Sequence, residues 1–416
     1  MKFYLRTHGC RANQYDSEVV RAMLLSSGAL EASGPEDAEV AIFNSCSVTA
    51  AAEAELRKEI RRAARVNSSL RTIVMGCAPG LASRDESISP LRTLPTVSDL
   101  IAGADLPGIA AAVGLSREAA SRTRGAQTGA RGLLRIQDGC DEHCTFCMTT
   151  TARGANRSRP ARELIDEATA LAAAHPEIVL TGIHIGAYGV DTGNSLSSLV
   201  EKLISSVPQV RFRLSSLEAT EVDDRLREMF ADRERLAPYL HAPLQSGSDR
   251  VLRRMGRTWY TAATYESSIE RIVSGKGAFG LGADIICGFP GETEEDHRQT
   301  VMLVERLPFT SLHVFPYSPR PGTAATRLGR SVGSENVRQR AEELHEITRR
   351  KSQLYNSLRA GTSADIVVIK AGEGLTEDYL SVAVPDLQFR RGHRFQAILA
   401  WQSGQLRATS TQALSA

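Results

Sequence analysis

The sequence lacks any apolar run of about 18 residues, the length that a helix needs to cross a membrane. Its first residues, MKFYLRTHGC, begin with a strand-like pattern and lack the apolar run of a signal peptide. Low-complexity tracts and short repeats are also missing. These absences predict a globular protein without membrane contact, and we expect a cytoplasmic location.

The chain also has little net charge. It has 50 Lys and Arg against 48 Asp and Glu, a formal charge of +2, so global charge does not indicate a nucleic-acid partner. If the protein binds a nucleic acid, we expect the contact to be made by a local basic patch. Hydrophobic residues make up 42% of the 416 residues, enough for packed cores, and the length predicts two or three domains.

Cysteine is scarce, and its number is odd. The seven cysteines lie at positions 10, 46, 77, 140, 144, 147 and 287. In a reducing cytosol this number argues against disulfides and favours metal ligands or catalytic thiols. Cys287 is the exception, because it lies within the apolar strand pattern ADIICGF and is predicted to be a buried core thiol.

Strand and helix patterns alternate in the first part of the chain. Strands are predicted at 2–8, 38–45 and 71–76, and helices at 16–28 and 49–67, the second capped by Thr49. This alternation predicts a parallel, flavodoxin-like sheet over residues 1–113. Cys10, Cys46 and Cys77 each follow one of these strands, so we expect the three thiols to converge at the carboxyl edge of the sheet, where ligands bind.

A polar segment, 114–131, is predicted to be a linker. Six strand patterns, each followed by a helix, then predict a partial (β/α)6 barrel over residues 132–358. Short strand patterns separated by Gly, Asp and Glu predict a small all-β, barrel-like domain over 359–416. The fold class is therefore α/β with a small all-β domain at the C-terminus.

The motif CDEHCTFC follows the first strand of the predicted barrel. Cys140, Cys144 and Cys147 can hold one corner of a four-iron cluster and leave its fourth iron open. The alternative is a zinc site in which His143 completes the ligand set. The spacing of the cysteines and the aromatic Phe146 favour the cluster.

Several stretches resemble the radical S-adenosylmethionine (SAM) superfamily and, within it, the methylthiotransferases. They are THGCRANQYDSE, NSCSVT, MGCAPG, RIQDGCDEHCTFC, ARG, VLTGIHIGAYG, HAPLQSGSDRVLRRMGR, DIICGFPGETEED and HVFPYSPRPGTAA. The resemblance extends over almost the whole chain. It implies a methylthiotransferase N-terminal domain over 1–113, a radical SAM core over 132–358 and an OB-like, RNA-binding TRAM domain over 359–416.

The resemblance implies two [4Fe–4S] clusters. Cys140, Cys144 and Cys147 would hold the cluster that cleaves SAM to a radical, and Cys10, Cys46 and Cys77 an auxiliary cluster that carries the sulfur. One SAM methylates the sulfur and a second makes the radical, so each turnover uses two. A flavodoxin- or ferredoxin-type reductant is implied, whereas the sulfur donor is not indicated.

The family has three kinds of substrate. The blocks GCRANQYDSE, RIQDGC, TGIHIGAYG and HVFPYSPRPGT most resemble the subgroup that modifies threonylcarbamoyladenosine beside the tRNA anticodon. The alternatives are the same chemistry on isopentenyl-adenosine in tRNA or on an aspartate of a ribosomal protein. An alternative of another class is a non-catalytic RNA-binding protein with structural clusters or zinc.

Other site residues are inferred from the same resemblance. Ser216, Glu218, Gln245 and Gly288 correspond to positions that bind SAM, although each could instead have a structural role. A basic group after the cysteine motif could contact RNA phosphates or form a solvated loop; its members are Arg153, Arg157, Arg159 and Arg162.

One departure from the family lies between the cysteine motif and the ARG triplet. Thr150 and Thr151 stand where the family usually has Pro-Tyr. Loss of this aromatic residue would change either the stacking of a substrate or the packing of the loop.

Overall fold

The computed structural model describes residues 1–47, 49–82, 91–116, 118, 127–385 and 389–413. The chain forms two compact units. The first unit comprises Met1–Thr128, Gln137–Arg157 and Ser318–Arg327, and the second comprises Gly129–Ile136, Ser158–Tyr317 and Leu328–Ala416. The predicted linker, 114–131, lies partly outside the described residues, at 117 and 119–126.

The first unit contains a five-stranded parallel sheet in the order β2-β1-β3-β4-β5, which is the order of flavodoxin-like folds. Its strands are β1 (Lys2–Thr7), β2 (Leu30–Glu31), β3 (Val40–Ser45), β4 (Arg71–Gly76) and β5 (Val97–Ala102). The three predicted strands are confirmed, and the sheet has two more strands, β2 and β5, that the sequence did not predict. β2 is only two residues long, and most side chains of β5 are partly or fully exposed, so neither gives a clear apolar pattern.

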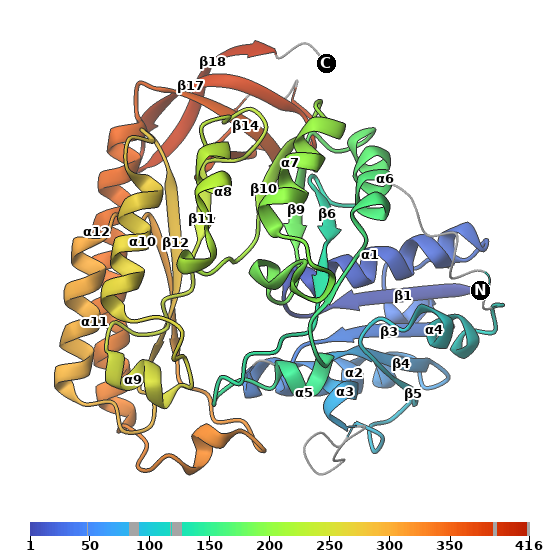
Figure 1. The fold of residues 1–416 in the computed structure, drawn as a ribbon. Helices are drawn as coiled ribbons and strands as arrows, with labels where there is room; N and C mark the ends of the chain where they lie inside the picture. Colours follow the sequence, from blue (N-terminus) through green and yellow to red (C-terminus); the bar gives the residue numbers. More distant parts are fainter. Residues whose placement is uncertain (48, 83–90, 117, 119–126, 386–388, 414–416) are drawn as a thin grey trace. The chain divides into compact units, whose positions relative to one another are not determined.

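Helices cover both faces of this sheet (Figure 1). Val40 and Ile42 of β3 face α1 (Arg11–Ser26) and α4 (Leu106–Ala112), whereas Ala41 and Phe43 face α2 (Ala50–Val66). Successive side chains of a strand point to opposite faces, so a run of apolar residues in β3 builds both cores. Thr49 caps α2 as predicted, because its hydroxyl accepts a hydrogen bond from the Ala52 N–H at 3.1 Å.

The first unit also contains three short elements: α3 (Cys77–Ala82), β7 (Gln137–Asp138) and α5 (Thr149–Arg153). α3 and α5 pack together through Cys77, Leu81, Met148 and Ala152. The segments 137–157 and 318–327 therefore belong to the first unit, although both lie within the predicted barrel domain, 132–358. This division differs from the predicted domain boundaries because the cysteine loop, residues 140–147, leads into a helix that packs on α3.

The second unit contains two parallel three-stranded sheets, β10-β9-β6 and β11-β12-β13. Two isolated parallel bridges, Phe212↔Leu236 and Ser216↔His241, link the first sheet to the region of β11. The strands are β6 (Gly132–Arg135), β9 (Glu177–Thr181), β10 (Arg211–Leu214), β11 (Tyr239–His241), β12 (Gly280–Cys287) and β13 (Ser311–Pro316). All six predicted strands are confirmed, while their closure into a partial barrel stays a prediction.

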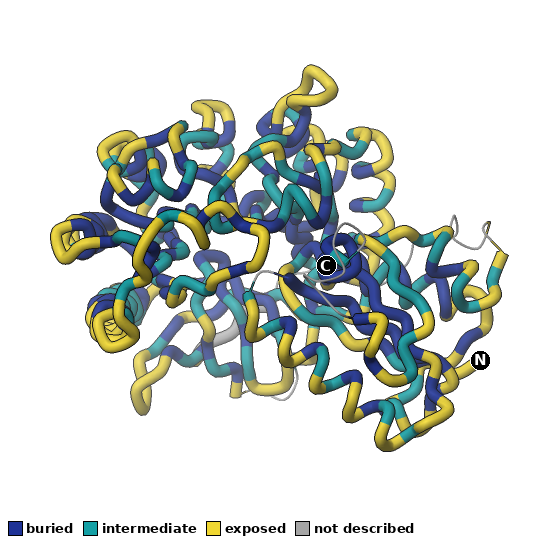
Figure 2. The backbone as a smooth tube through the Cα atoms, turned by 90° about the horizontal axis from the view of Figure 1, so that it is seen from below, coloured by how far each residue is buried: buried dark blue, intermediate teal, exposed yellow. Residues whose placement is uncertain are grey.

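Helices follow the strands of this unit. They are α6 (Ala161–Ala172), α7 (Leu196–Ser206), α8 (Asp224–Met229), α9 (Asp249–Arg254), α10 (Ala262–Val273), α11 (Glu294–Arg306) and α12 (Ser334–Arg359). Figure 2 colours the backbone by burial, and buried and exposed stretches alternate along these helices. Among the residues that the structure describes, no helix is long and apolar enough to span a membrane.

The C-terminal strands of the second unit form a closed barrel in the order β14-β15-β16-β18-β17. They are β14 (Ser363–Lys370), β15 (Glu373–Thr376), β16 (Ser381–Ala383), β17 (Arg394–Gln402) and β18 (Gln405–Ala413). The predicted small all-β domain is thus observed, with β15 as an additional strand. The sequence EGLT of β15 is short and includes a glycine, which weakens a strand pattern.

Candidate functional site

The three early cysteines lie at the carboxyl ends of three adjacent strands of the first unit. Cys10 precedes α1 after β1, Cys46 directly follows β3, and Cys77 directly follows β4. Ser45 and Gly76, the residues before the last two thiols, are paired across the sheet. The predicted placement of the three thiols at one edge of the sheet is therefore confirmed.

Asn13 is a buried residue at this edge that was not among the predicted site residues. Its Nδ2 donates to the carbonyl of Ser45 at 2.7 Å and to that of His8 at 3.1 Å. Its Oδ1 lies 3.5 Å from the Sγ of Cys10 and 4.0 Å from the Sγ of Cys77. Asn13 thus connects the loops that carry all three thiols. Its position three residues after Cys10, at the start of a helix, was the signal available in the sequence.

The cysteine loop presents N–H groups to its own sulfurs. The N–H of Glu142 donates to the Sγ of Cys140 at 3.4 Å, and the N–H of Thr149 donates to the Sγ of Cys147 at 3.3 Å. Hydrogen bonds to cysteine sulfur are among the features that tune iron–sulfur sites. The N–H of Cys147 also donates to the carbonyl of Cys144 at 3.0 Å, which closes the turn between these two cysteines.

Thr150 holds the cysteine loop from the side. Its hydroxyl lies 3.1 Å from the carbonyl oxygen of Cys140 and 3.0 Å from that of Glu142, and it can donate to either. Gly139, just before Cys140, has a φ of +75°, and a Cβ there would lie 1.9 Å from the carbonyl oxygen of Ala155. Only glycine satisfies both conditions, so the backbone before Cys140 is tightly constrained.

Arg153 is not available to an RNA phosphate, which corrects the prediction for this residue. Its side chain is 1% exposed and forms ion pairs with Asp16 at 3.0 Å and Asp138 at 3.3 Å. Its Nη2 donates to the Oδ1 of Asn13 at 2.7 Å, and its Nε donates to the Sγ of Cys77 at 3.3 Å. The guanidinium is therefore part of the thiol site of the first unit.

The other predicted arginines differ in exposure. Arg157, in the first unit, is 59% exposed and can still meet a phosphate. Arg159, in the second unit, pairs with Glu167 at 2.7 Å and donates to the carbonyl of Arg135 at 2.9 Å. Arg162 is exposed at the start of α6. Exposure thus favours Arg157 and Arg162 as RNA contacts over Arg153.

The residues present fit iron–sulfur ligation. All seven cysteines are free thiols. Within the described ranges, no three His, Cys, Asp or Glu side chains are placed to hold a single metal ion, as a structural zinc site requires. A cubane binds each thiolate to a different iron atom, so its ligand sulfurs lie farther apart than those around a single ion.

Burial raises the pKa of one thiol in each unit. Burial raises the pKa of Cys77 to about 11, and the nearby charge of Arg153 acts in the opposite direction. Burial also raises the pKa of Cys287, to about 12, within the core of the second unit. Cys287 is therefore the buried core thiol that the sequence predicts.

In the second unit, the predicted SAM-binding residues lie beyond the carboxyl ends of β10, β11 and β12. Ser216 follows β10, and its hydroxyl lies 2.8 Å from the Nδ1 of His241. The Nε2 of His241 lies 3.3 Å from a carboxylate oxygen of Asp284. Gln245 has a φ of +63°, a strained value for a non-glycine residue that is common at functional sites.

Glu218 and Gly288 have structural partners in the second unit. Glu218 is buried, forms an ion pair with Arg257 and caps a short 3-10 helix. Burial raises the pKa of Glu218, although Arg257 opposes the shift. Gly288 has a φ of +73°, and a Cβ there would meet Val337 at 2.4 Å. The packing of α12 is thus sufficient to require this glycine.

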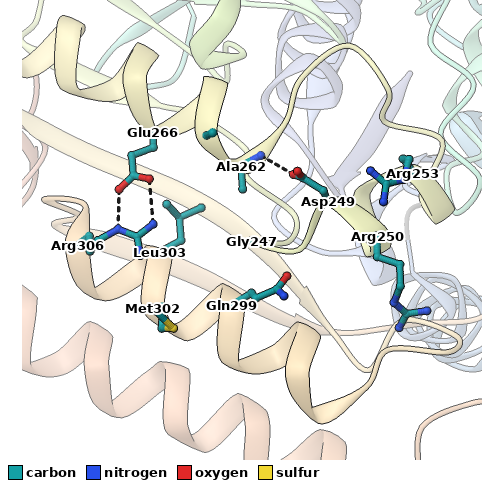
Figure 3. A pocket seen from close by; sticks show the side chains of 11 residues that line it. Gly247, Asp249, Arg250, Arg253, Ala262, Glu266, Gln299, Met302, Leu303 and Arg306 are labelled. Carbon is teal, nitrogen blue, oxygen red and sulfur yellow. Dashed lines mark hydrogen bonds and ion pairs between the residues drawn. The ribbon is translucent and has the colours of Figure 1, made fainter.

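A surface pocket of about 530 Å³ lies elsewhere on the second unit, among α9, α10 and α11 (Figure 3). Glu266 and Arg306 form a two-point ion pair on one side, and Asp249 accepts a hydrogen bond from the Ala262 N–H at 2.7 Å on the other. None of the predicted site residues lines this pocket. It is therefore distinct from the predicted SAM site.

Two known protein families match this chain, one over its N-terminal part and one over its central part. Residues 2–100 match the family described as uncharacterized protein family UPF0004, and residues 134–304 match the radical SAM superfamily. A threonylcarbamoyladenosine tRNA methylthiotransferase MtaB of Aquifex aeolicus is 31% identical over 92% of this chain and 96% of its own. The chain belongs to the radical SAM methylthiotransferase family, in its MtaB subgroup. It is therefore a transferase.

Two further relatives are similar over most of the chain, and one solved structure shares the fold. The MtaB protein of Thermotoga maritima is 34% identical over 87% of this chain and 85% of its own. The tRNA-2-methylthio-N(6)-dimethylallyladenosine synthase of Erythrobacter litoralis is 32% identical over 89% and 87%. The radical SAM methyltransferase TsrM of Kitasatospora setae shares the fold, with a TM-score of 0.57, 13% identity and coverage of 78% of this chain and 73% of that one.

Proposed function

We propose that this methylthiotransferase modifies tRNA and inserts a methylthio group at carbon 2 of threonylcarbamoyladenosine beside the anticodon. The observation that carries the proposal is the presence in one compact unit of two sets of three cysteines, one following three adjacent parallel strands and one in the cysteine loop. The names of the MtaB relatives support the choice of nucleoside.

The two sets of thiols would hold two [4Fe–4S] clusters, Cys140, Cys144 and Cys147 one of them and Cys10, Cys46 and Cys77 the other. When bound, these groups supply the electron that cleaves SAM and the sulfur that is transferred, at a cost of two SAM per turnover. The protein places the thiols: Thr150 fixes the cysteine loop, and Asn13 joins the loops of the other set.

Contact with tRNA would come from exposed basic groups and from the C-terminal barrel. We propose that this closed five-stranded barrel is the TRAM domain, because its size and position in the chain agree with the resemblance. Arg157 and Arg162 are the predicted basic residues that remain accessible. A flavodoxin- or ferredoxin-type reductant and a cytoplasmic location complete the proposal.

Nucleoside mass spectrometry of tRNA from a deletion strain tests the substrate. Loss of the methylthio form of threonylcarbamoyladenosine, restored by the intact gene but not by Cys10→Ala, would support the proposal. Cys287→Ala is the matched control and should restore the nucleoside, because this thiol is packed in the core. Persistence of the methylthio nucleoside in a strain with no second enzyme would contradict the substrate.

A second candidate, isopentenyl-adenosine in tRNA, is favoured by the similarity to the dimethylallyladenosine synthase of Erythrobacter litoralis. The same spectra distinguish the two, because each methylthio nucleoside has its own mass. Metal analysis tests the clusters separately. Two cubanes require about eight irons per chain after anaerobic reconstitution, whereas stoichiometric zinc without iron would support the non-catalytic alternative.

A further inference from the structure

Arg153 connects the two sets of cysteines within the first unit. It lies six residues after Cys147, at the end of α5, yet its Nε reaches the Sγ of Cys77 at 3.3 Å. α5 approaches α3 closely, because a Cβ on Gly80 would lie 2.4 Å from the carbonyl oxygen of Ala152. The backbone contact between the two helices therefore fixes where the guanidinium lies.

The guanidinium is held in place by groups on α1 and β7. Nη2 meets Asn13 and Asp16 of α1 at 2.7 and 3.0 Å, and Nη1 meets Asp138, two residues before Cys140, at 3.3 Å. The planar fork of arginine allows Nε, Nη1 and Nη2 to face different partners at once, which the single ammonium of lysine cannot do. These contacts leave the Nε–H directed at the sulfur of Cys77.

We propose that Arg153 is a positioning residue for the iron–sulfur cluster of Cys10, Cys46 and Cys77, to whose Cys77 sulfur it donates a charged hydrogen bond. The inference rests on the proposed function, because it requires that these thiols hold a cluster. A cationic donor at a ligand sulfur stabilises the reduced, more negative state of a cluster and so raises its reduction potential. The same residue couples the position of Cys77 to that of the cysteine loop.

The test uses the full chain with Cys140, Cys144 and Cys147 replaced by alanine, so that any cluster formed is the one on the other three thiols. In this background we compare Arg153→Gln and Arg153→Lys with Arg320→Gln, measuring iron per chain and the reduction potential by anaerobic spectroscopic titration. Arg320 is the matched control because it is also a buried arginine of the first unit, but its partner is the carboxylate of Glu53, at 2.7 Å.

We expect Arg153→Gln to shift the potential to more negative values, Arg153→Lys to restore part of the shift, and Arg320→Gln to leave it unchanged. Iron loss in Arg153→Gln alone would also support the proposal. An unchanged potential in Arg153→Gln, an equal shift in Arg320→Gln, or iron loss in all three variants would overturn it. If the background chain with Arg153 intact holds no iron, the cluster assignment of the proposed function fails instead.

Discussion

Glu177 is a buried carboxylate at the centre of an ion cluster in the second unit. It is fully buried at the start of β9, and its carboxylate receives hydrogen bonds from Arg211 at 2.7 Å and Arg213 at 2.8 Å. Both arginines are also fully buried, and both reach the C-terminal barrel: Arg211 pairs with Asp365 at 3.0 Å, and Arg213 donates to the carbonyl of Thr376 at 3.1 Å. One carboxylate therefore supports two strands and their contact with this barrel.

We predict that Glu177→Gln strongly destabilises the second unit. Glutamine keeps the shape but removes the charge, so the two buried guanidinium groups lose their shared carboxylate and keep the partial compensation of Asp365 and Glu377. Removing one partner of a buried ion pair typically costs about 3–5 kcal/mol, which corresponds to a fall in Tm of roughly 10 °C for a unit of this size. Scanning calorimetry of the full chain measures this change.

The same substitution should have a pH-dependent cost. Burial by itself would raise the pKa of Glu177, but the charges and hydrogen bonds of Arg213 and Arg211 hold the pKa well below its usual value. A carboxylate with a lowered folded pKa contributes stability above its unfolded pKa of about 4.3 and loses it as the pH falls further. The difference between Glu177→Gln and the parent should therefore be complete at pH 7 and should shrink below about pH 4.

The matched control is Glu167→Gln, which removes the partly exposed pair with Arg159. A pair of this kind contributes about 1 kcal/mol or less. If Glu177→Gln also cost less than about 1 kcal/mol at pH 7, or if its cost stayed constant during acidification, the account of Glu177 as the compensating charge of this cluster would be refuted.

Two further substitutions test the thiol site of the first unit. Gly80→Val should force α3 and α5 apart, because its Cβ would lie 2.4 Å from the backbone oxygen of Ala152. We expect a loss of about 1–3 kcal/mol in unfolding free energy and less iron per chain. An iron content equal to that of the parent would contradict the close contact. Thr150→Val removes the hydroxyl that meets the carbonyls of Cys140 and Glu142. We expect about 1 kcal/mol of destabilisation and faster loss of iron to a chelator, whereas Thr150→Ser keeps the hydroxyl and is the control. An unchanged rate of iron loss in Thr150→Val would show that the loop does not need this hydrogen bond.

The elements that the sequence predicts correctly are those with strong local patterns. The buried strands β3 and β4, and α2 with its cap, combine apolar periodicity with clear ends. α5 has no such pattern, since three consecutive threonines are poor helix formers. It is helical where it packs on α3, a contact between segments about 70 residues apart that local patterns cannot reveal.

The thiol site shows the same division. The positions of Cys10, Cys46 and Cys77 could be predicted, because each follows an apolar strand and parallel strands end at one edge. The role of Arg153 could not, because it depends on Asn13, which is 140 residues away in the sequence. The basic spacing of the ARG region suggested a solvated surface, whereas neighbouring carboxylates allow this arginine to be buried.

Thr150 and Thr151 replace the Pro-Tyr pair of the family, and the structure explains the first of the two residues. A proline at position 150 would restrict the backbone through its ring. Thr150 instead connects the backbone of this region to the cysteine loop by its hydroxyl, through the carbonyls of Cys140 and Glu142. The loop is thus held by a side-chain hydrogen bond in place of a fixed φ. Nothing in the structure explains Thr151 in the same way, but it is the position at which the aromatic residue of the family is lost. Thr151→Tyr, assayed on tRNA nucleosides, should therefore affect turnover while leaving iron content unchanged.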